Sequence, residues 1–227
     1  MELEITLPDE VPVMTLPEAA LFPQALMPLH IFEPRYRHML RDVLASNRLL
    51  AVAGLDRGRL GESGNPEPPY RIATVGMVRA CQKNGNGTSN LLLQGLTRVE
   101  ILAITRDEPY RSVRVRALVS EGGADAARNQ ELRRRLARLI GIKLRLQTGA
   151  VDEIATFLKT VEDPETFSDI AAFSLCEDSG LKQRLLETLD VGRRLELLAD
   201  QLLTDIEELK LKRRLQGRLP DDHISLN

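Results

Sequence analysis

The side chains of this chain that could act as a general base at neutral pH are three histidines, His30, His38 and His223. They fall in an extended segment, on the polar face of a predicted helix and near the C-terminus, so we do not expect them to converge on one site. The run Gly61-Glu-Ser-Gly64 matches a nucleophile elbow poorly. Its second glycine comes one residue early, and its flanks have loop composition where that motif needs a strand and a helix.

Other signatures of catalysis are missing from the sequence. It has no G-x-x-x-x-G-K-[ST] phosphate loop, no G-x-G-x-x-G, no H-E-x-x-H and no C-x-x-C. Cys81 and Cys176 lie far apart without companions at metal-ligand spacing, which favours two reduced thiols over a disulfide or a metal site. We therefore expect no catalytic residues, no metal and no small-molecule cofactor, and the sequence predicts a binding protein rather than an enzyme.

The charge pattern limits the partners. Net charge is −2, charged residues make up 28% of the chain, and no apolar run reaches the roughly 20 residues that a spanning helix needs. With an acidic N-terminus in place of a basic signal peptide, we expect a cytoplasmic protein without a membrane partner. One predicted helix is rich in arginine, which fits either a nucleic-acid surface or, as charge runs usually do, a solvated or internally paired face. Its arginines are Arg128, Arg133, Arg134, Arg135 and Arg138.

Residues 21–44 are the part of the chain on which the predicted fold is organised, because an extended apolar segment there leads directly into a helix. Pro23 and Pro28 favour an edge strand or bulge across Leu26–Phe32. Pro34 suits the first helical position, and the apolar period then changes from two to about 3.6. The apolar stripe of this helix consists of Tyr36, Met39, Leu40, Val43 and Leu44, opposite His38, Arg41 and Asp42.

Strand patterns dominate the rest of the first half. Gly76 predicts a bulge, Lys83–Thr88 is a strong turn signal, and Gly95 is expected to break the run that follows. Between Asp56 and Pro69 the composition is that of a surface loop. Antiparallel strands at this spacing favour a small barrel. The predicted strands are Val11–Leu16, Leu49–Leu55, Ile72–Gln82, Asn90–Gln94, Thr97–Thr105 and Val113–Val119.

Beyond Glu121–Asp125 the period becomes helical. We predict a domain at residues 1–121, a helical domain at 122–216 and a flexible tail at 217–227. Asp163, Asp178 or Ser179, and Asp190 are candidate caps for the later helices. The last helix is long, and its apolar seam could pack within a bundle or pair with a second copy of the chain. That seam consists of Leu195, Ala199, Leu202, Ile206 and Leu209.

Several ordered blocks of sequence resemble one family. Pro28-Leu-His-Ile-Phe-Glu-Pro-Arg-Tyr36, preceded by Leu21-Phe-Pro23, is similar to the opening of the N-terminal substrate-recognition domain of ATP-dependent Lon proteases and their free-standing relatives. Later blocks agree in order and separation. They are Ile72-Ala-Thr-Val-Gly76, Leu92-Leu-Gln-Gly-Leu-Thr-Arg98, Pro109-Tyr110, Lys182-Gln-Arg-Leu-Leu186 and Arg194-Leu-Glu-Leu-Leu198.

The resemblance implies an α+β fold: an N-terminal PUA-like antiparallel β-barrel of about six strands with one inserted helix, followed by a C-terminal α-helical bundle ending in a long helix. It also implies a non-enzymatic substrate-recognition module that binds unfolded polypeptide or a partner protein in protein quality control. If the sequence is complete, it lacks the ATPase and protease domains that follow in a full Lon protease, and it can neither hydrolyse ATP nor cleave peptides.

The candidate binding residues are Leu26, Met27, Phe32, Glu33 and Arg35, at the entry to the predicted helix. The alternative is that these residues are structural and belong to the core and the hinge, because Phe, Leu and Met are more often buried than exposed. The alternative function is RNA binding, since PUA-like barrels resemble RNA modules and the first half of the chain carries several arginines. These are Arg98, Arg106, Arg111, Arg114 and Arg116. An aromatic content of 4% leaves little surface for base stacking, so nucleic acid is the less favoured partner.

Overall fold

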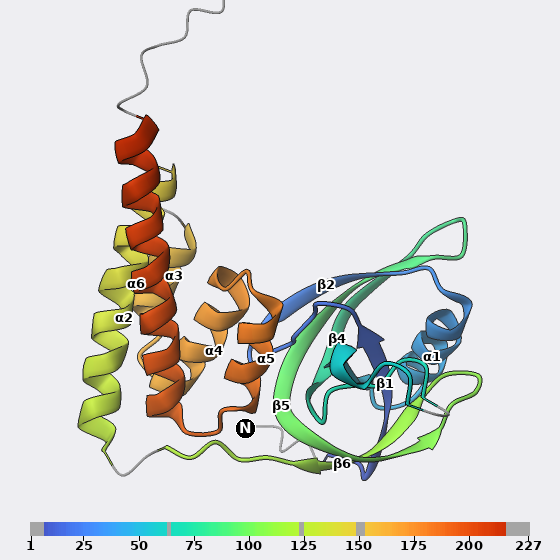
Figure 1. Ribbon diagram of the computed structural model, residues 1–227. Coiled ribbons are helices and arrows are strands. Elements are labelled where there is room, and N and C mark those ends of the chain that lie inside the picture. Colours follow the sequence, from blue (N-terminus) through green and yellow to red (C-terminus); the bar gives the residue numbers. More distant parts are fainter. Residues whose placement is uncertain (1–6, 63–64, 123–124, 149–152, 217–227) are drawn as a thin grey trace, which may run out of the picture. The chain divides into compact units, whose positions relative to one another are not determined.

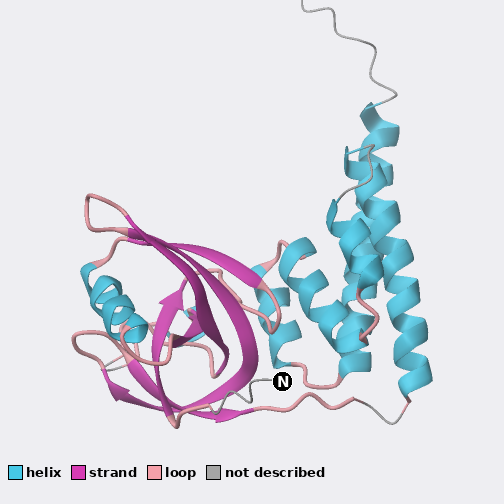
Figure 2. Cartoon of the chain, turned by 180° about the vertical axis from the view of Figure 1, so that it is seen from behind, coloured by secondary structure: helices cyan, strands magenta, loops and turns pink. Residues whose placement is uncertain are grey.

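The computed structural model describes residues 7–62, 65–122, 125–148 and 153–216, and shows an α+β protein (Figures 1 and 2). The chain divides into two compact units. One contains the residues up to Glu121 together with Asp169–Leu189, and the other contains Gly122–Ser168 and the residues from Asp190. The domain bounds expected from the sequence, 1–121 and 122–216, stay a prediction. None of the helices in the described ranges combines the length and the apolar character needed to cross a membrane.

The strand-containing unit is built on six strands in the order β2-β5-β4-β3-β1-β6. An additional pairing of β5 with β6 makes β1, β3, β4, β5 and β6 a closed ring of hydrogen-bonded neighbours, visible as the curved strands of Figure 2. The strands are β1 Glu10–Leu16, β2 Leu26–Ile31, β3 Leu49–Gly54, β4 Ile72–Lys83, β5 Ser89–Arg106 and β6 Ser112–Ala117. Between β3 and β4 lies a short 3₁₀ turn, Arg57–Arg59.

The prediction of a wholly antiparallel sheet is wrong for one pair. β1 and β3 run parallel, with Val13 beside Ala51 and Leu16 beside Gly54. A parallel pair needs a long crossover connection, and the segment between these strands, which contains β2 and α1, supplies it. All other pairings are antiparallel.

Small and β-branched residues of alternating positions fill the inside of the ring. Their alternation follows from the two-residue period of a strand, which sends every second side chain to the same face. The buried cluster consists of Val11, Val13, Leu49, Ala51, Ala53, Ala73, Val75, Val99, Ile101, Val113 and Val115.

Strand β5 is continuous through Gly95, so the prediction of a break there is wrong. Glycine is needed here because the Phe22 backbone passes very close to β5. A Cβ at this position would lie 2.0 Å from the carbonyl oxygen of Phe22. Gly95 N–H donates to the oxygen of Ala25 at 2.9 Å, and its own oxygen accepts from Gln24 N–H at 2.9 Å. The predicted bulge at Gly76 is confirmed by a register shift between Val75 and Gly76.

The predicted helix after Pro34 is confirmed as α1, Pro34–Leu44. Tyr36, Met39, Leu40 and Val43 of its apolar stripe are buried, and Leu44 is half-buried. The Tyr36 hydroxyl donates to the backbone oxygen of Thr15 at 3.3 Å, which ties the helix to β1. His38, Arg41 and Asp42 are exposed, as the helical period predicts.

A buried ion pair joins β5 to the helical segment of the same unit. Arg98 donates to both carboxylate oxygens of Asp169 at 2.6 and 2.7 Å, and its Nε donates to the oxygen of Leu186 at 3.1 Å. Both side chains are 1% exposed. The guanidinium also lies over the ring of Phe22, 5.9 Å from its centroid. Nearby, Gln183 donates to the oxygen of Ile72 at 3.1 Å, so α5, Ser179–Glu187, is tied to β4.

The other unit is helical, with α2, Ala126–Thr148, packed along α6, Val191–Gln216. Buried Leu136 and Ile140 of α2 and the seam residues Leu195, Ala199, Leu202 and Ile206 of α6 supply its apolar core. Lys143 of α2 pairs with Asp205 of α6 at 2.6 Å. The remaining helices of the chain are α3, Glu153–Thr160, and α4, Pro164–Leu175.

Three predicted caps are confirmed. Thr166 N–H donates to Asp163, Leu181 N–H to Asp178 and Arg193 N–H to Asp190, each through the carboxylate. The arginine-rich helix is α2, and three of its arginines have carboxylate partners: Arg128 contacts Glu196, and Arg134 and Arg138 contact Glu131. This favours the internally paired interpretation of that charge run. The predicted tail, 217–227, lies outside the described residues.

Removing Arg98 should destabilise the strand-containing unit severely. Arg98→Met leaves the Asp169 carboxylate buried without its main partner, so we expect the free energy of unfolding to fall by about 3–5 kcal/mol. Urea denaturation measures it. Arg116→Met is the matched control, since that arginine pairs with Glu100 from an exposed position, and it should cost less than about 1 kcal/mol. Equal losses of unfolding free energy in Arg98→Met and Arg116→Met would contradict the special importance of the buried Arg98–Asp169 pair.

Gly95→Ala should lower the free energy of unfolding by about 3 kcal/mol or more, because the new methyl group cannot coexist with the Phe22 carbonyl without moving the backbone. Gly85→Ala, in the turn between β4 and β5, is the control: nothing lies within 4 Å of its Cβ position. We expect that variant to stay within about 0.5 kcal/mol of wild type. A tolerated Gly95→Ala, measured by the same urea titration, would show that the close approach is not required.

Candidate functional site

Two features of the strand-containing unit stand out as binding surfaces, and the first is the exposed side of β2. Leu26, Pro28 and His30 alternate outward, and Phe32 continues the row just beyond the strand. Leu26 is 50% exposed and Phe32 61% exposed. The His30 and Phe32 rings stack with centroids 6.1 Å apart, and His30 Nδ1 lies 2.6 Å from Asn90 Oδ1. Aromatic and aliphatic surface is therefore held out toward solvent in a fixed row.

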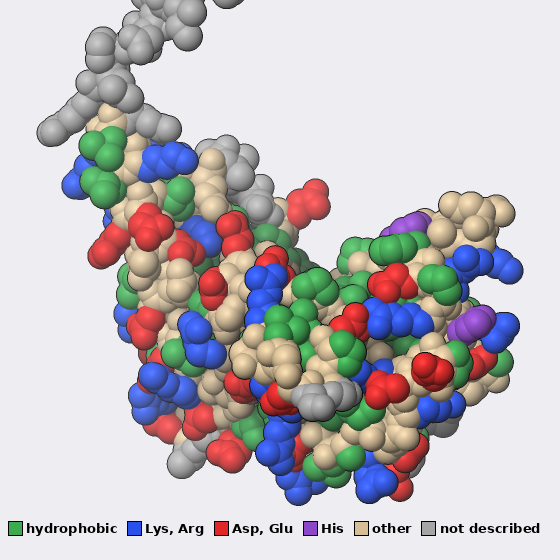
Figure 3. Space-filling view, turned by 45° about the vertical axis from the view of Figure 1, so that its right-hand side comes forward, with side chains coloured by type: hydrophobic (Ala, Val, Ile, Leu, Met, Phe, Trp, Pro, Cys, Tyr) green, Lys and Arg blue, Asp and Glu red, His purple; other side chains and the backbone are tan. Residues whose placement is uncertain are grey.

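Neighbouring strands extend this surface. Pro28 lies beside Leu92 of β5, and Leu92 lies beside Ala80 of β4, so all three side chains point to the same side of the sheet. We call Leu26, Pro28, His30, Phe32, Leu92 and Ala80 the outer face. Figure 3 shows hydrophobic side chains interspersed with charged ones over one side of the molecule. Within the described residues β2 pairs only with β5, so its other edge is open.

The next residues form an ion-paired hinge between β2 and α1. Arg35 donates to both carboxylate oxygens of Glu67 at 2.6 and 3.0 Å and to Glu33 at 3.0 Å. Its guanidinium lies over the Tyr36 ring, 4.6 Å from the centroid. The hydrogen bond to Glu67 raises the pKa of Arg35, and burial raises the pKa of Tyr36. Arg35 therefore stays charged and the Tyr36 hydroxyl stays neutral at physiological pH, and the ion pairs of Arg35 hold the segment that follows Phe32.

The five residues predicted from sequence thus occupy different environments. Leu26 and Phe32 lie on the outer face, whereas Met27 is only 8% exposed and packs inward. Glu33 and Arg35 are half-exposed and belong to the hinge. Sequence reasoning did not select Pro28 and Leu92. The even-numbered alternation from Leu26 to Phe32 was the signal for Pro28, whereas Leu92 required the strand register.

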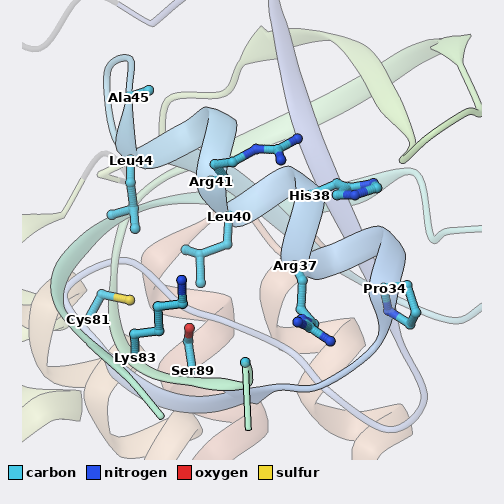
Figure 4. Close-up of a pocket in the computed structure, with 11 residues that line it drawn as sticks. Pro34, Arg37, His38, Leu40, Arg41, Leu44, Ala45, Cys81, Lys83 and Ser89 are labelled. Atoms are coloured by element: carbon cyan, nitrogen blue, oxygen red, sulfur yellow. The ribbon is translucent and has the colours of Figure 1, made fainter. Parts of the chain in front are cut away.

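The second feature is a pocket of about 690 Å³ between α1 and the β4–β5 hairpin. In Figure 4, Arg37, Leu40 and Leu44 extend from α1 toward the hairpin, while His38 and Arg41 point away from it. Cys81, Lys83 and Ser89 line the pocket from the hairpin side. The pocket combines aliphatic and cationic surface, and its lining residues come from two separate segments of sequence.

The candidate catalytic histidines lie apart in the part of the chain that the structure describes. It contains no group of three or more His, Cys, Asp or Glu side chains able to hold a metal ion. His30 lies on the outer face and His38 on α1, while His223 lies outside the described ranges. Part of the Gly61–Gly64 run, residues 63–64, is outside them too. The geometry of both features is suited to binding.

Comparison with known proteins identifies a family. The model of the ATP-dependent protease La (LON) substrate-binding domain matches residues 10–204. Similar curated proteins are the Lon protease of Desulfosudis oleivorans, 26% identical over 95% of this chain, and that of Heliobacterium modesticaldum, 29% identical over 93%. The matched region is 26% of the length of each, so the chain spans about a quarter of these relatives.

Solved structures show the same fold. The N-terminal domain of the Mycobacterium avium complex Lon protease matches with a TM-score of 0.67 and 20% identity, over 85% of this chain and 97% of that domain. A Lon N-terminal domain protein from Xanthomonas campestris matches with a TM-score of 0.60 and 21% identity, over 86% of this chain and 97% of that protein.

The pocket predicts a difference in reactivity between the two cysteines. Cys81 is half-buried in the pocket wall, whereas Cys176 is buried. With limiting iodoacetamide under native conditions, we expect Cys81 to be alkylated at least roughly tenfold faster, because reaction requires access of the reagent to the thiolate. Peptide mass mapping of a time course measures both rates, and denaturant should equalise them. Faster alkylation of Cys176 would contradict the pocket geometry.

Proposed function

Because the chain belongs to the family of ATP-dependent protease La (LON) substrate-binding domains, we propose that it is a non-catalytic recognition module that binds exposed apolar segments of unfolded polypeptide. The observation that carries the proposal is the outer face, where Leu26 and Phe32 remain exposed on a fixed strand. Its relatives are named proteases, which supports a role in selecting polypeptides for proteolysis.

The outer face offers two ways of holding an extended segment. A bound strand could add to the open edge of β2, or its side chains could lie over Phe32 and Leu26. Pro28 cannot donate a backbone hydrogen bond, which weakens strand addition and favours side-chain contacts. Burying 100–200 Å² of apolar surface, a rough value for one or two large side chains, is worth only about 3–5 kcal/mol before the cost of association. We therefore expect weak, reversible binding.

RNA binding is the alternative, and the contacts of the arginines that motivated it weigh against it. Arg98 is buried against Asp169, Arg111 pairs with Asp107, and Arg116 pairs with Glu100. Arg106 donates to Ser112 and lies over the Tyr110 ring. Of this set, Arg114 alone has no such contact within the described ranges. Little of this positive charge is left for phosphate groups.

The closed ring of strands supports interpreting the first unit as the PUA-like barrel implied by the family resemblance. The β5–β6 ladder, from Val99 beside Ala117 to Arg106 beside Ser112, closes the ring. Arg116 and Glu100 are directly opposite and ion-paired there, and the hydrogen bond from Arg116 holds the pKa of Glu100 below its usual range. This cross-strand pair adds an electrostatic contact to the closing ladder.

The proposal predicts that polypeptide affinity depends on the outer face. We expect the double variant Leu26→Ser/Phe32→Ser to bind a fluorescent, unstructured apolar peptide roughly tenfold more weakly than wild type, because truncating central apolar contacts costs about 1–2 kcal/mol. Fluorescence anisotropy measures the dissociation constants. Leu60→Ser is the matched control: Leu60 is 51% exposed, as Leu26 is, but lies in the loop after β3.

An unchanged affinity in Leu26→Ser/Phe32→Ser, or an equal loss in Leu60→Ser, would contradict the proposed surface. A titration of the same wild-type protein with single-stranded RNA distinguishes RNA binding from polypeptide binding. Affinity for RNA that falls steeply with salt, without affinity for the peptide, would favour the RNA function instead. Circular dichroism should show that the variants keep the wild-type fold.

A further inference from the structure

The pocket under α1 carries positive charge that the rest of the unit does not neutralise. Arg37 and Lys83 form no ion pair with any residue in the described ranges. Several other arginines of this unit contact a carboxylate, among them Arg41 of the same lining, which pairs with Asp42; the rest are Arg35, Arg57, Arg59, Arg71, Arg98, Arg111 and Arg116. No Asp or Glu lines the pocket. Its field is therefore suited to a negatively charged ligand.

The same pocket has an aliphatic wall. Leu40 and Leu44 of α1 face Cys81 across it, and the arginine and lysine contribute their aliphatic stems. The Ser89 hydroxyl points into the space and has no hydrogen-bond partner among the described residues. A ligand that fits this lining carries an anionic group, accepts a hydrogen bond and presents an aliphatic portion.

Nucleic acids fit this lining less well, and three backbone donors of the neighbouring turn that could contact phosphate are already used. In the β4–β5 turn, Asn84 and Gly87 N–H donate to backbone oxygens, and Thr88 N–H donates to Asn86 Oδ1. The helix begins with Pro34, which has no N–H. The lining has no Phe, Tyr or Trp for base stacking, and His38 is its one aromatic ring.

The position of the pocket links it to the outer face. Ile31, the last residue of β2, pairs with Ser89, which lines the pocket, and Phe32 follows on the outer face. Pro34, another lining residue, is two residues after Phe32. Ile31 and Ser89 face the side of the sheet opposite the outer face, because side chains alternate along a strand. A polypeptide that reaches both surfaces must therefore pass around the end of β2 between Phe32 and Pro34, with an apolar side chain on Phe32 and a carboxylate several residues away in the pocket.

We propose that the pocket between α1 and the β4–β5 hairpin is an acidic-peptide site, in which Arg37, Lys83 and the Ser89 hydroxyl bind the carboxylate of a Glu or Asp that flanks an apolar segment. The inference rests on the proposed function in that the ligand is a polypeptide. It adds a preference: apolar segments with acidic neighbours bind more tightly than the same segments with neutral or basic neighbours. The aliphatic wall of Leu40 and Leu44 packs against the methylene groups of the bound residue.

The test uses three labelled peptides with one apolar core, flanked by Glu, by Gln or by Lys. In anisotropy titrations with the full chain, we expect the Glu peptide to bind roughly tenfold more tightly than the Gln peptide, and the Lys peptide to bind most weakly. Arg37→Gln/Lys83→Gln should abolish the difference between the Glu and Gln peptides. Arg114→Gln removes an exposed arginine of β6, outside the pocket, and should leave the difference unchanged.

A second measurement needs no variant. Saturating Glu peptide should slow alkylation of Cys81 by iodoacetamide several-fold, while the Gln peptide at the same concentration should protect it less. Equal affinity of wild type for the Glu and Gln peptides, or a Glu preference that survives in Arg37→Gln/Lys83→Gln, would overturn the proposal. It would also be overturned if inorganic pyrophosphate or single-stranded RNA, but not the Glu peptide, bound in a manner dependent on Arg37 and Lys83.

The outcomes distinguish this inference from the proposed function. If the Gln peptide binds through Leu26 and Phe32 without any acidic preference, the pocket proposal alone fails. If the Glu preference depends on Arg37 and Lys83 while Leu26→Ser/Phe32→Ser leaves all affinities unchanged, the outer-face proposal alone fails. Loss of binding in both sets of variants supports one polypeptide occupying both surfaces.

Discussion

The constraint on which the rest of this structure depends is the close approach of the Phe22–Ala25 backbone to β5 at Gly95. It lets one strand of 18 residues serve two purposes. The part of β5 after Gly95 pairs with β6 and closes the ring, and the part before it pairs with β2 and carries the outer face. A side chain at this position would separate the two backbones, and with them the outer face from the ring.

The Arg98–Asp169 pair is a second long-range constraint on the same strand. Arg98 lies three residues after Gly95, and with both partners buried the pair is stable only if their hydrogen bonds are made. A carboxylate 71 residues away meets that requirement, together with the Leu186 carbonyl. A buried ion pair is weak evidence for net stability, but it tolerates few alternative partners. We infer that its contribution is specificity, because Asp169 and the Leu186 carbonyl both lie in the helical segment that Arg98 contacts.

Local sequence patterns made much of this fold predictable. Most features that were not predicted depend on strand pairing between distant segments. The α1 stripe, the caps at Asp163, Asp178 and Asp190 and the bulge at Gly76 depend on residues a few positions apart. The parallel pairing of β1 with β3 depends on the path of the chain between them. Leu26 and Met27 differ by one position, yet strand register sends one outward and the other inward. The pocket joins segments some 40 residues apart, which no local pattern reveals.

Two weak surfaces suit the module proposed above, which would select polypeptides and then release them. The outer face is interrupted by Pro28 and His30, so it offers few apolar contacts to any one segment. An exposed cationic site contributes little on its own, because solvent and salt screen it. When one polypeptide binds both the outer face and the pocket, the second contact forms at a high effective concentration. The overall affinity then rises although each surface alone binds weakly. Under this proposal, selectivity comes from the order of apolar and acidic residues in the ligand, and breaking either contact is enough to begin release.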